Sequence, residues 1–394
     1  MWIVFVIVVG LVIWAVLDFY FGGQRHKMEK DRLSLSPKKG NAEFFSTGDP
    51  FFAKLFEDLK QAESFIFVQF YIVRDDLIGK EMLQILKKKA SEGVEVYLLV
   101  DSIGSKLPTN TVDKLKDVGV FFAYSQRPKL PFLLYSLNRR NHRKLTVIDS
   151  KIGYIGGFNV GVEYLGRDPK LGKWRDYHLR LTGDVIESFL EIISFDWKKA
   201  TKEDLYPPVH KSTNSSTEHF QMVATNGAYI EHFFMEFIEK AEKSIFIGTP
   251  YFIPGPNLVK TLIKAVKRGV RVTLLIPMKA DHPFVKEAAF PYFLPLLHAG
   301  AEVYRYYPGF YHAKVLMIDR KVCDIGTANF DKRSFYFNDE VNCIFESPAL
   351  IKEIEKVIAF DIEESERLTL TDVGNRSILQ RGKEIVALSI SRFL

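Results

Sequence analysis

The chain has 394 residues, of which 47% are apolar and 26% charged; this composition excludes a disordered or fibrous protein. At roughly 150 residues per domain the length allows two to three domains. The net charge of +6 suits an anionic surface or substrate but is too weak to indicate nucleic-acid binding. The two cysteines, Cys323 and Cys343, form no CxxC pair, which excludes a disulfide framework and a cysteine zinc site.

The N-terminal segment predicts a membrane anchor. Residues 1–21 contain one charged side chain, Asp18, and as a helix would extend about 31 Å, enough to cross a hydrocarbon core of about 30 Å. They lack the basic start and the small-residue cleavage site of a signal peptide, and a buried core helix is the less favoured alternative. Basic residues dominate the stretch that follows. The positive-inside bias therefore predicts a single-pass anchor in the cell membrane, with the catalytic part cytoplasmic.

The rest of the chain is a duplicated domain. EGVEVYLLVD (92–101) recurs as RGVRVTLLIP (268–277), and NHRKLTVIDSKIGYIGGFN (141–159) matches YHAKVLMIDRKVCDIGTAN (311–329) at a shift of 170. The predicted order is a transmembrane anchor at 1–21, a basic juxtamembrane linker at 22–42, a first repeat at 43–206, a polar linker at 207–220, a second repeat at 221–367 and a C-terminal tail at 368–394.

Each copy alternates helical and strand patterns. Apolar residues at helical spacing predict helices, and short β-rich runs predict strands. The expected helices are 49–62, 77–91, 229–241 and 258–268; the expected strands are 65–71, 94–100, 245–252 and 270–276. Short strand pairs closed at 149–151 and 319–321 have the pattern of hairpins. We therefore predict an α/β fold with mixed sheets flanked by helices.

A repeated motif carries the candidate chemistry. Residues two apart on a strand share a face, so His142 and Lys144 should project together, as should His312 and Lys314. A lone histidine on a strand is more often structural. The string H-x-K-x4-D-x6-G-x2-N in both copies favours catalysis instead: one imidazole attacks a phosphodiester, the other protonates the leaving group, and the lysines neutralise phosphate oxygens. This chemistry needs no metal or cofactor, and the sequence offers no carboxylate cluster for a metal.

Other residues of the motif are candidates for binding phosphate or shaping the site. Gly157, next to Gly156, and the Gly326-Thr327 pair would let the backbone approach a phosphate closely. The candidate side-chain donors are Asn159 and, in the second copy, Thr327 and Asn329. Asp149 and Asp319 complete the motif as members of the candidate catalytic set. At a hairpin tip, however, an aspartate commonly bonds its own turn, which favours a structural role.

With these motifs, the sequence resembles the phospholipase D superfamily, whose signature is a doubled HxK(x)4D motif. The resemblance covers nearly everything after residue 43. It is strongest to bacterial cardiolipin synthases, in their short form with one membrane segment. The strings that carry it are NHRKLTVIDSKIGYIGGFN, GKWRDYHLRLTG (172–183), TPYFIP (249–254), YHAKVLMIDRKVCDIGTANFDKRSF and NDEVN (338–342). The resemblance implies two phospholipase D-type domains about a pseudo-two-fold axis, with both HxK pairs in one cleft.

The resemblance also implies residue roles and a reaction. An acid some 25–35 positions past each motif histidine orients that imidazole, which points to Asp176 for His142 and to Glu340 for His312. It makes His142 the nucleophile and His312 the general acid. The implied reaction transfers a phosphatidyl group between two phosphatidylglycerols to give cardiolipin, with anionic membrane lipids as partners.

Several alternatives remain open at the level of sequence. A membrane-anchored phospholipase D hydrolase would use the same residues with water as acceptor and release phosphatidic acid. A nuclease is disfavoured, so no nucleic-acid partner is expected, and a non-catalytic scaffold would be expected to have lost part of one motif. The aromatic segments 127–144 and 282–300 and the tail could rest on the bilayer or on the protein. The pattern makes no prediction of oligomeric state.

Overall fold

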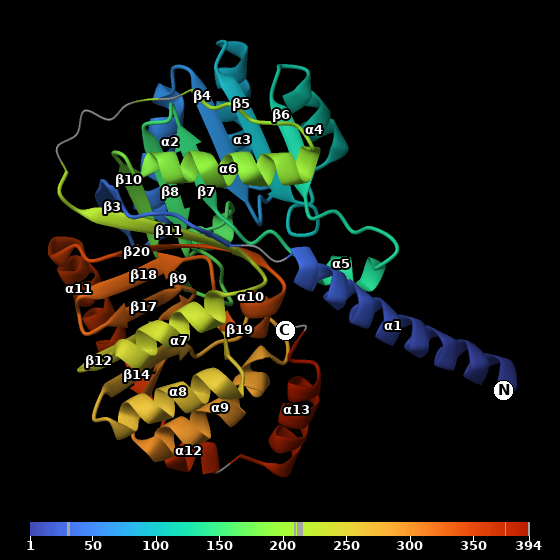
Figure 1. The fold of residues 1–394 in the computed structure, drawn as a ribbon, viewed down its shortest axis with the longest axis vertical. Coiled ribbons are helices and arrows are strands. Elements are labelled where there is room, and N and C mark those ends of the chain that lie inside the picture. Colours follow the sequence, from blue (N-terminus) through green and yellow to red (C-terminus); the bar gives the residue numbers. More distant parts are fainter. Residues whose placement is uncertain (30–31, 209, 211–215, 375, 393–394) are drawn as a thin grey trace.

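The computed structural model describes residues 1–29, 32–208, 210, 216–374 and 376–392, which form two lobes and a projecting helix (Figure 1). The first lobe has a seven-stranded sheet in the order β3-β10-β8-β7-β4-β5-β6. The second sheet contains the matching order β11-β20-β18-β17-β12-β14-β15, with β1 and β21 at its edges. Parallel pairing joins β4-β5-β6 and β12-β14-β15, whereas β7 and β17 pair antiparallel. The sheets are therefore mixed and topologically equivalent.

The strands have the following bounds: β1 Arg32–Ser34, β2 Lys38–Lys39, β3 Asn41–Phe45, β4 Phe65–Phe70, β5 Glu95–Asp101, β6 Phe121–Ser125, β7 Leu145–Ile148, β8 Ile152–Gly156, β9 Lys173–Arg175, β10 His178–Thr182, β11 His219–Asn226, β12 Ser244–Gly248, β13 Phe252–Ile253, β14 Arg271–Pro277, β15 Glu302–Tyr306, β16 Gly309–Tyr311, β17 Val315–Ile318, β18 Val322–Gly326, β19 Phe330–Asp331, β20 Asp339–Phe345 and β21 Ser365–Arg367. The helices are α1 Trp2–Glu29, α2 Gly48–Gln61, α3 Leu77–Ser91, α4 Thr109–Lys116, α5 Leu133–Asn138, the 3-10 turn Val162–Leu165, α6 Ile186–Thr201, α7 Ile230–Lys240, α8 Pro256–Lys267, α9 Val285–Ala299, α10 Lys332–Tyr336, α11 Pro348–Glu363, α12 Leu370–Gly374 and α13 Ile378–Ser389.

The inner faces of the two sheets share one apolar core. Phe67 and Leu145 of the first sheet belong to the same buried cluster as Met317 and Val341 of the second, together with side chains of α6 and α11. The outer faces are covered separately, the first by α2, α3 and α4 and the second by α7, α8 and α9. Central strands such as β4 are buried on both faces, which explains their uninterrupted apolar sequences.

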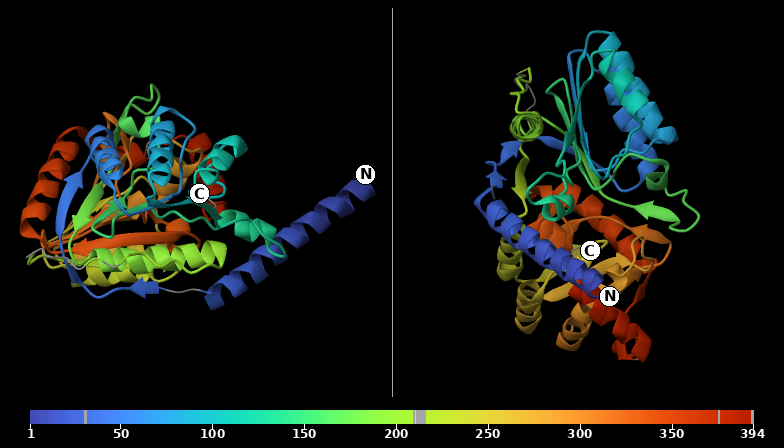
Figure 2. Two further views of the ribbon diagram at one scale, coloured as in Figure 1. Left: turned by 90° about the horizontal axis from the view of Figure 1, so that it is seen from above. Right: turned by 90° about the vertical axis from the view of Figure 1, so that its right-hand side faces the viewer.

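Helix α1 is long and apolar enough to cross a membrane, and it projects away from both lobes (Figure 2). Its last turns nevertheless pack on the body. A Cβ on Gly22 would lie 2.6 Å from Cβ of Tyr135, so only glycine allows α5 to approach this closely. His26 is buried, with Nδ1 2.6 Å from the Tyr135 hydroxyl and Nε2 2.8 Å from the carbonyl of Asn226. The end of α1 is therefore joined to both lobes.

The structure differs from the predicted juxtamembrane linker over 22–42. The helix continues to Glu29 because its end is packed on α5, and β1 and β2 then pair with β11 of the second lobe. Much of the expected linker 207–220 lies outside the described residues. The predicted tail forms α12 and α13, which pack on α9, and Val373 and Ala387 are buried in the outer core of the second lobe.

One buried carboxyl group in the second sheet predicts a pH-dependent stability. Asp324 accepts a 2.6 Å hydrogen bond from Nδ2 of Asn342, but burial outweighs this contact and raises the Asp324 pKa to about 7. Because the unfolded chain releases this proton near pH 4, the free energy of unfolding should fall as pH rises from about 4 to about 7. We expect Asp324→Asn to remove this part of the dependence. Melting temperatures of both proteins between pH 5 and 8 test it, and parallel curves would contradict it.

Candidate active site

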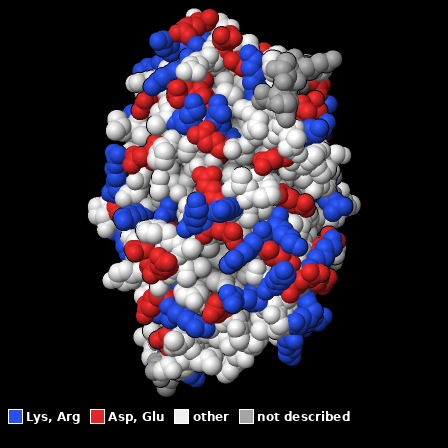
Figure 3. Space-filling model, turned by 90° about the vertical axis from the view of Figure 1, so that its left-hand side faces the viewer, with Lys and Arg blue, Asp and Glu red and all other residues white. Residues whose placement is uncertain are grey.

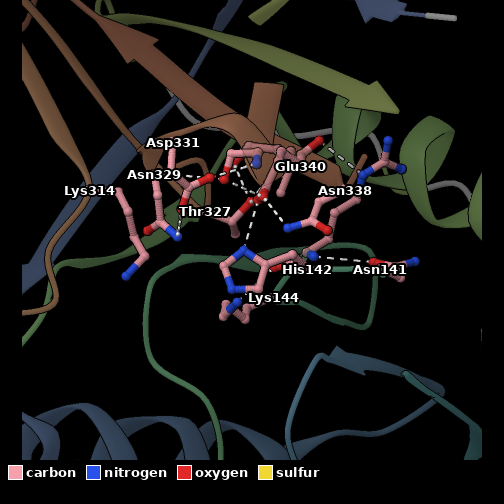
Figure 4. A network of polar contacts seen from close by, with 12 residues as sticks. Asn141, His142, Lys144, Lys314, Thr327, Asn329, Asp331, Asn338 and Glu340 are labelled. Atoms are coloured by element: carbon pink, nitrogen blue, oxygen red, sulfur yellow. Dashed lines mark hydrogen bonds and ion pairs between the residues drawn. The ribbon is translucent and has the colours of Figure 1, made fainter. Parts of the chain in front are cut away.

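The two HxK pairs lie in loops that lead into equivalent strands. His142 and Lys144 directly precede β7, and His312 and Lys314 precede β17, so the expected strand placement is displaced to the residues just before each strand. All four side chains are buried. The charge of Lys314 acts on His142, and that of Lys144 acts on His312. The two pairs therefore share one site between the lobes, and Figure 4 shows His142 with both lysines.

Each catalytic-loop histidine contacts a carboxylate of the other lobe. Nδ1 of His142 lies 3.0 Å from Oε2 of Glu340, and Nδ1 of His312 lies 2.5 Å from Oδ2 of Asp176. Glu340 and Asp176 thus each contact a motif histidine of the other repeat, so the predicted pairing within each repeat is wrong. The reason is that Glu340 lies at the start of β20 and Asp176 directly after β9, at the boundary between the lobes, where each acid faces the loop of the opposite repeat. The backbone also pairs across the two repeats. The N–H of His142 donates to the carbonyl of Asp339, and the N–H of His312 donates to the carbonyl of Arg175.

Short contacts hold both carboxylates in place. Glu340 accepts a hydrogen bond from Oγ1 of Thr327 at 2.6 Å (Figure 4). It also accepts one from Oγ of Ser334 at 2.9 Å. Asp176 occupies the space above Gly157, where a Cβ would lie 1.9 Å from its Oδ1. Gly157 therefore leaves room for Asp176, and Thr327 holds Glu340. Ser334 escaped the sequence reasoning because the corresponding residue of the first copy is Tyr164, so the repeat carries no signal for it.

The two motif asparagines are engaged within the protein. Asn159 accepts from the N–H of Ile72 at 3.2 Å and donates to the Tyr164 hydroxyl at 3.3 Å. Asn329 donates from Nδ2 to Oδ2 of Asp331 at 3.1 Å. Asn159 thereby links its loop to the segment after β4, whereas the Asn329 bond stays within its own loop. Each Nδ2 carries a second N–H, so the role of both amides as phosphate donors stays a prediction.

The motif aspartates lie at the hairpin tips, away from the histidines. Asp149 accepts hydrogen bonds from the N–H groups of Glu63, Ser64 and Phe65, at 2.8–3.0 Å for the closest contact of each. Asp319 accepts equivalent bonds from residues 242–244. Both have positive φ, 51° and 53°, which aspartate tolerates better than most residues. Their inclusion among catalytic residues is therefore corrected; the expected structural role is right, but they bond the chain before β4 and β12 rather than their own turns.

We expect Asp149→Ala to weaken folding while leaving the chemistry unchanged. The substitution leaves three backbone N–H groups without their acceptor, which should lower the free energy of unfolding by about 1–3 kcal/mol. Denaturant unfolding and turnover of the folded fraction should be measured side by side. A large fall in kcat at unchanged stability would assign Asp149 to the chemistry after all.

Burial sets the electrostatics of the site. It lowers the pKa of His142 to about 4 and of His312 to about 3, although the facing carboxylates oppose the shift, so both imidazoles are neutral at pH 7. Burial also lowers the pKa of Lys144 to about 7 and of Lys314 to about 8. Burial alone would raise the pKa of Glu340 and of Asp176, but the adjacent histidines and lysines hold both pKa values below the ordinary range. An anion between the lysines would favour their charged forms.

Arg143 ties the two lobes together behind His142. Its Nε donates to the carbonyl of Glu340 at 3.0 Å and its Nη2 to that of Thr225 at 2.9 Å, while Nη1 pairs with Asp196. Arg143 thus contacts Glu340, Thr225 and Asp196 rather than the imidazole of His142. Among the described residues no group of three or more His, Cys, Asp or Glu side chains is arranged to hold a metal ion.

Comparisons with known proteins agree with this geometry. A family profile described as cardiolipin synthase, PLD-like domain, matches residues 55–168 and 234–361. The chain is 39% identical to the minor cardiolipin synthase ClsB of Bacillus subtilis, over 100% of this chain and 99% of that protein. It is 36% identical to a cardiolipin synthase of Clostridium perfringens, over 89% of this chain and 76% of that one.

A solved structure shares the fold at low sequence identity. The phosphatidylserine synthase of Haemophilus influenzae superposes with a TM-score of 0.70 at 14% identity, covering 94% of this chain and 100% of that one. This likeness supports the two-lobed architecture. With both repeats matched by the profile and nearly the whole of one curated relative covered, the chain belongs to the cardiolipin synthase family of PLD-like proteins.

Proposed function

We propose that this protein makes cardiolipin by transferring the phosphatidyl group of one phosphatidylglycerol to the terminal hydroxyl of another. The observation that carries the proposal is the pair of neutral histidines, each with Nδ1 on a carboxylate of the opposite lobe. With its proton on Nδ1, an imidazole presents the Nε2 lone pair to a substrate. Two such groups beside two lysines provide a nucleophile, a proton carrier and charge neutralisation for one phosphodiester.

In the first half-reaction Nε2 of His142 attacks phosphorus and the bond to the glycerol oxygen breaks. That oxygen leaves with a proton from Nε2 of His312, and a phosphatidyl-histidine remains. Burial disfavours the protonated form of His312 in the empty site, and the negative charge of the bound diester raises the pKa of that group. Lys144 and Lys314 stabilise the charge on the non-bridging oxygens.

The second half-reaction reverses these roles. The terminal hydroxyl of a second phosphatidylglycerol gives its proton to Nε2 of His312 and attacks phosphorus. The nitrogen–phosphorus bond breaks, which frees His142 and yields cardiolipin. We assign His142 as the nucleophile by the family resemblance.

Mass spectrometry of phosphatidylglycerol vesicles incubated with the purified full-length protein and EDTA tests the reaction. We expect cardiolipin and free glycerol in equal amounts. Phosphatidic acid as the main product would make the protein a hydrolase, and an unchanged lipid would contradict both activities. Activity lost in EDTA and restored by a divalent cation would contradict the metal-free mechanism.

The placement at the membrane follows from how α1 meets the body. The Asp18 carboxylate accepts hydrogen bonds from the N–H groups of Leu134 and Tyr135, at 3.3 and 2.7 Å, so α5 lies beside the last turns of the predicted span. Leu130 is exposed next to α5. On the face turned away from α1, positive and negative side chains are interspersed rather than gathered in one positive stripe (Figure 3). We infer that α5 and the residues before it rest at the lipid surface, with the lobes in the cytoplasm.

Labelling of an introduced cysteine tests the orientation. Cys323 and Cys343 are buried, so Lys88→Cys on the exposed side of α3 supplies the reactive thiol. A membrane-impermeant maleimide should label it only after the cells are lysed. Labelling of intact spheroplasts would place the lobes outside the cytoplasm.

A further inference from the structure

A cavity of about 660 Å³ lies where the end of α1 meets both lobes, and the proposed reaction does not use it. Its walls come from the last turns of α1, the loop 124–129 after β6, the segment that leads to His142, and α6. This volume is within the range of ligand sites in proteins, about 300–1,000 Å³. Six cationic side chains line it: Arg25, Arg127, Lys129, Arg139, Lys199 and Lys202.

The acidic residues of the wall neutralise only part of the positive charge of these six side chains. Glu29 pairs with Arg25 at 3.1 Å and with Arg139 at 3.2 Å. Both oxygens of Asp339 lie 3.0 Å from Nζ of Lys199. The third acid, Asp196, is bound to Arg143, which is not part of the wall. The remaining cations, on the loop after β6 and at the end of α6, leave the cavity with a positive excess that favours an anion.

Arg139 and Lys199 place two partly desolvated cations in the wall of the cavity. Arg139 is 8% exposed, and its Nε has no hydrogen-bond partner within the described part of the chain. Leaving a buried donor unsatisfied costs about 1–3 kcal/mol, more for a charged group. The side chain of Lys199 is 30% exposed; desolvation and the charge of Arg139 lower the pKa of its ammonium despite the contact with Asp339. An anion in the cavity would offset the charge repulsion between Arg139 and Lys199.

The cavity is separate from the active site although the two share a wall. Asn141 and Asp339 line the cavity, whereas their neighbours His142 and Glu340 form the catalytic contact. Asn141 and Asp339 form an isolated parallel β-bridge, and the next residue of each segment, His142 and Glu340, lies on the active-site side. A molecule in the cavity would therefore lie on the opposite side of the segments that carry His142 and Glu340. It would not contact the reacting atoms.

We propose that this cavity binds the phosphate of an anionic phospholipid headgroup from the membrane that α1 crosses. The placement supports it, because Arg25 and Glu29 follow directly after the predicted span and lie at the level of lipid headgroups. Guanidinium groups match phosphate oxygens in geometry as well as in charge. The inference rests on the membrane placement proposed above. Free inorganic phosphate offers the same chemistry, and the experiment separates the two sources.

Hydrogen–deuterium exchange of the full-length protein in lipid nanodiscs tests this site. Three samples are compared: discs of phosphatidylcholine alone, discs with phosphatidylglycerol added, and phosphatidylcholine discs with inorganic phosphate. We expect phosphatidylglycerol to slow exchange in peptides covering 124–129 and 199–202, by roughly tenfold at a ligand level ten times Kd. Peptides over 309–316 report the active site in the same data. If the proposed reaction fails but the cavity binds lipid, peptides 309–316 will show no protection while the cavity peptides stay protected.

A charge-matched pair of variants completes the design. Arg127→Gln with Lys202→Gln removes two exposed cations of the cavity and should abolish the protection. Lys260→Gln with Lys264→Gln removes two exposed cations from α8 and should leave it intact. Protection by inorganic phosphate as well as lipid would support a phosphate site that soluble anions also enter. Equal exchange in all samples, protection by phosphate without lipid protection, or protection that survives in the cavity variant would each overturn the proposal.

Discussion

Alanine at His142 or at His312 is expected to lower the rate of cardiolipin formation by roughly 10⁴-fold or more, while leaving the fold intact. Without His142 no phosphatidyl-histidine can form, and without His312 the glycerol oxygen must leave unprotonated. Both side chains lie at the boundary between the lobes, where their removal leaves the apolar cores untouched. Mass spectrometry of the lipid products measures the rate, and thermal unfolding checks the fold.

A change of leaving group separates the two histidines. Nitrophenolate needs no proton to depart, so a phosphatidyl-p-nitrophenol substrate should restore release of the leaving group in His312→Ala but not in His142→Ala. His232 is exposed on α7 and pairs with Glu236, so His232→Ala gives a matched control. Restoration in His142→Ala instead would exchange the assigned roles. Appreciable cardiolipin synthesis by either alanine variant would rule out the two-histidine mechanism.

The second large effect is expected when the acids that contact the two histidines are replaced by amides. Glu340→Gln and Asp176→Asn should each lower kcat by roughly 10²–10⁴-fold with little change in KM. An amide can donate a hydrogen bond to Nδ1 and so favour the tautomer with its proton on Nε2, which removes the lone pair needed for attack. The carboxylates also raise the pKa of the histidines, so their loss should shift the pH–rate profile to lower pH.

The crossed pairing makes this prediction specific. Because Glu340 contacts His142, Glu340→Gln should behave like His142→Ala and gain nothing from the nitrophenol substrate. Asp176→Asn should behave like His312→Ala and be restored by it. Glu239→Gln, on the exposed side of α7, is the control for loss of an acid. The opposite assignment of the two acids would show that they act within their own repeats.

Much of the architecture is readable from the sequence because it depends on local patterns. The apolar run of β4 and the helical spacing of α3 each specify their own element, and two copies of the whole pattern specify two equivalent sheets. The doubled HxK string also identifies the two histidines and two lysines of the site from a local pattern. Both members of each pair lie in one short loop that leads into a strand. The acids at 176 and 340 were found by the family resemblance and not by any local pattern.

The partners of those residues depend on contacts between segments far apart in the chain. Glu340 is 198 positions from His142, and nothing in the spacing tells which lobe an acid will face. The same holds for Asp149, whose hydrogen-bond donors are 84–86 positions away in the chain. It also holds for His26, which contacts Asn226 across 200 positions. Sequence by itself determined the repeat, the elements and the chemical groups, because these follow from nearest neighbours and periodicity. Only the tertiary structure decided which groups meet, because that follows from how two sheets pack around a shared core.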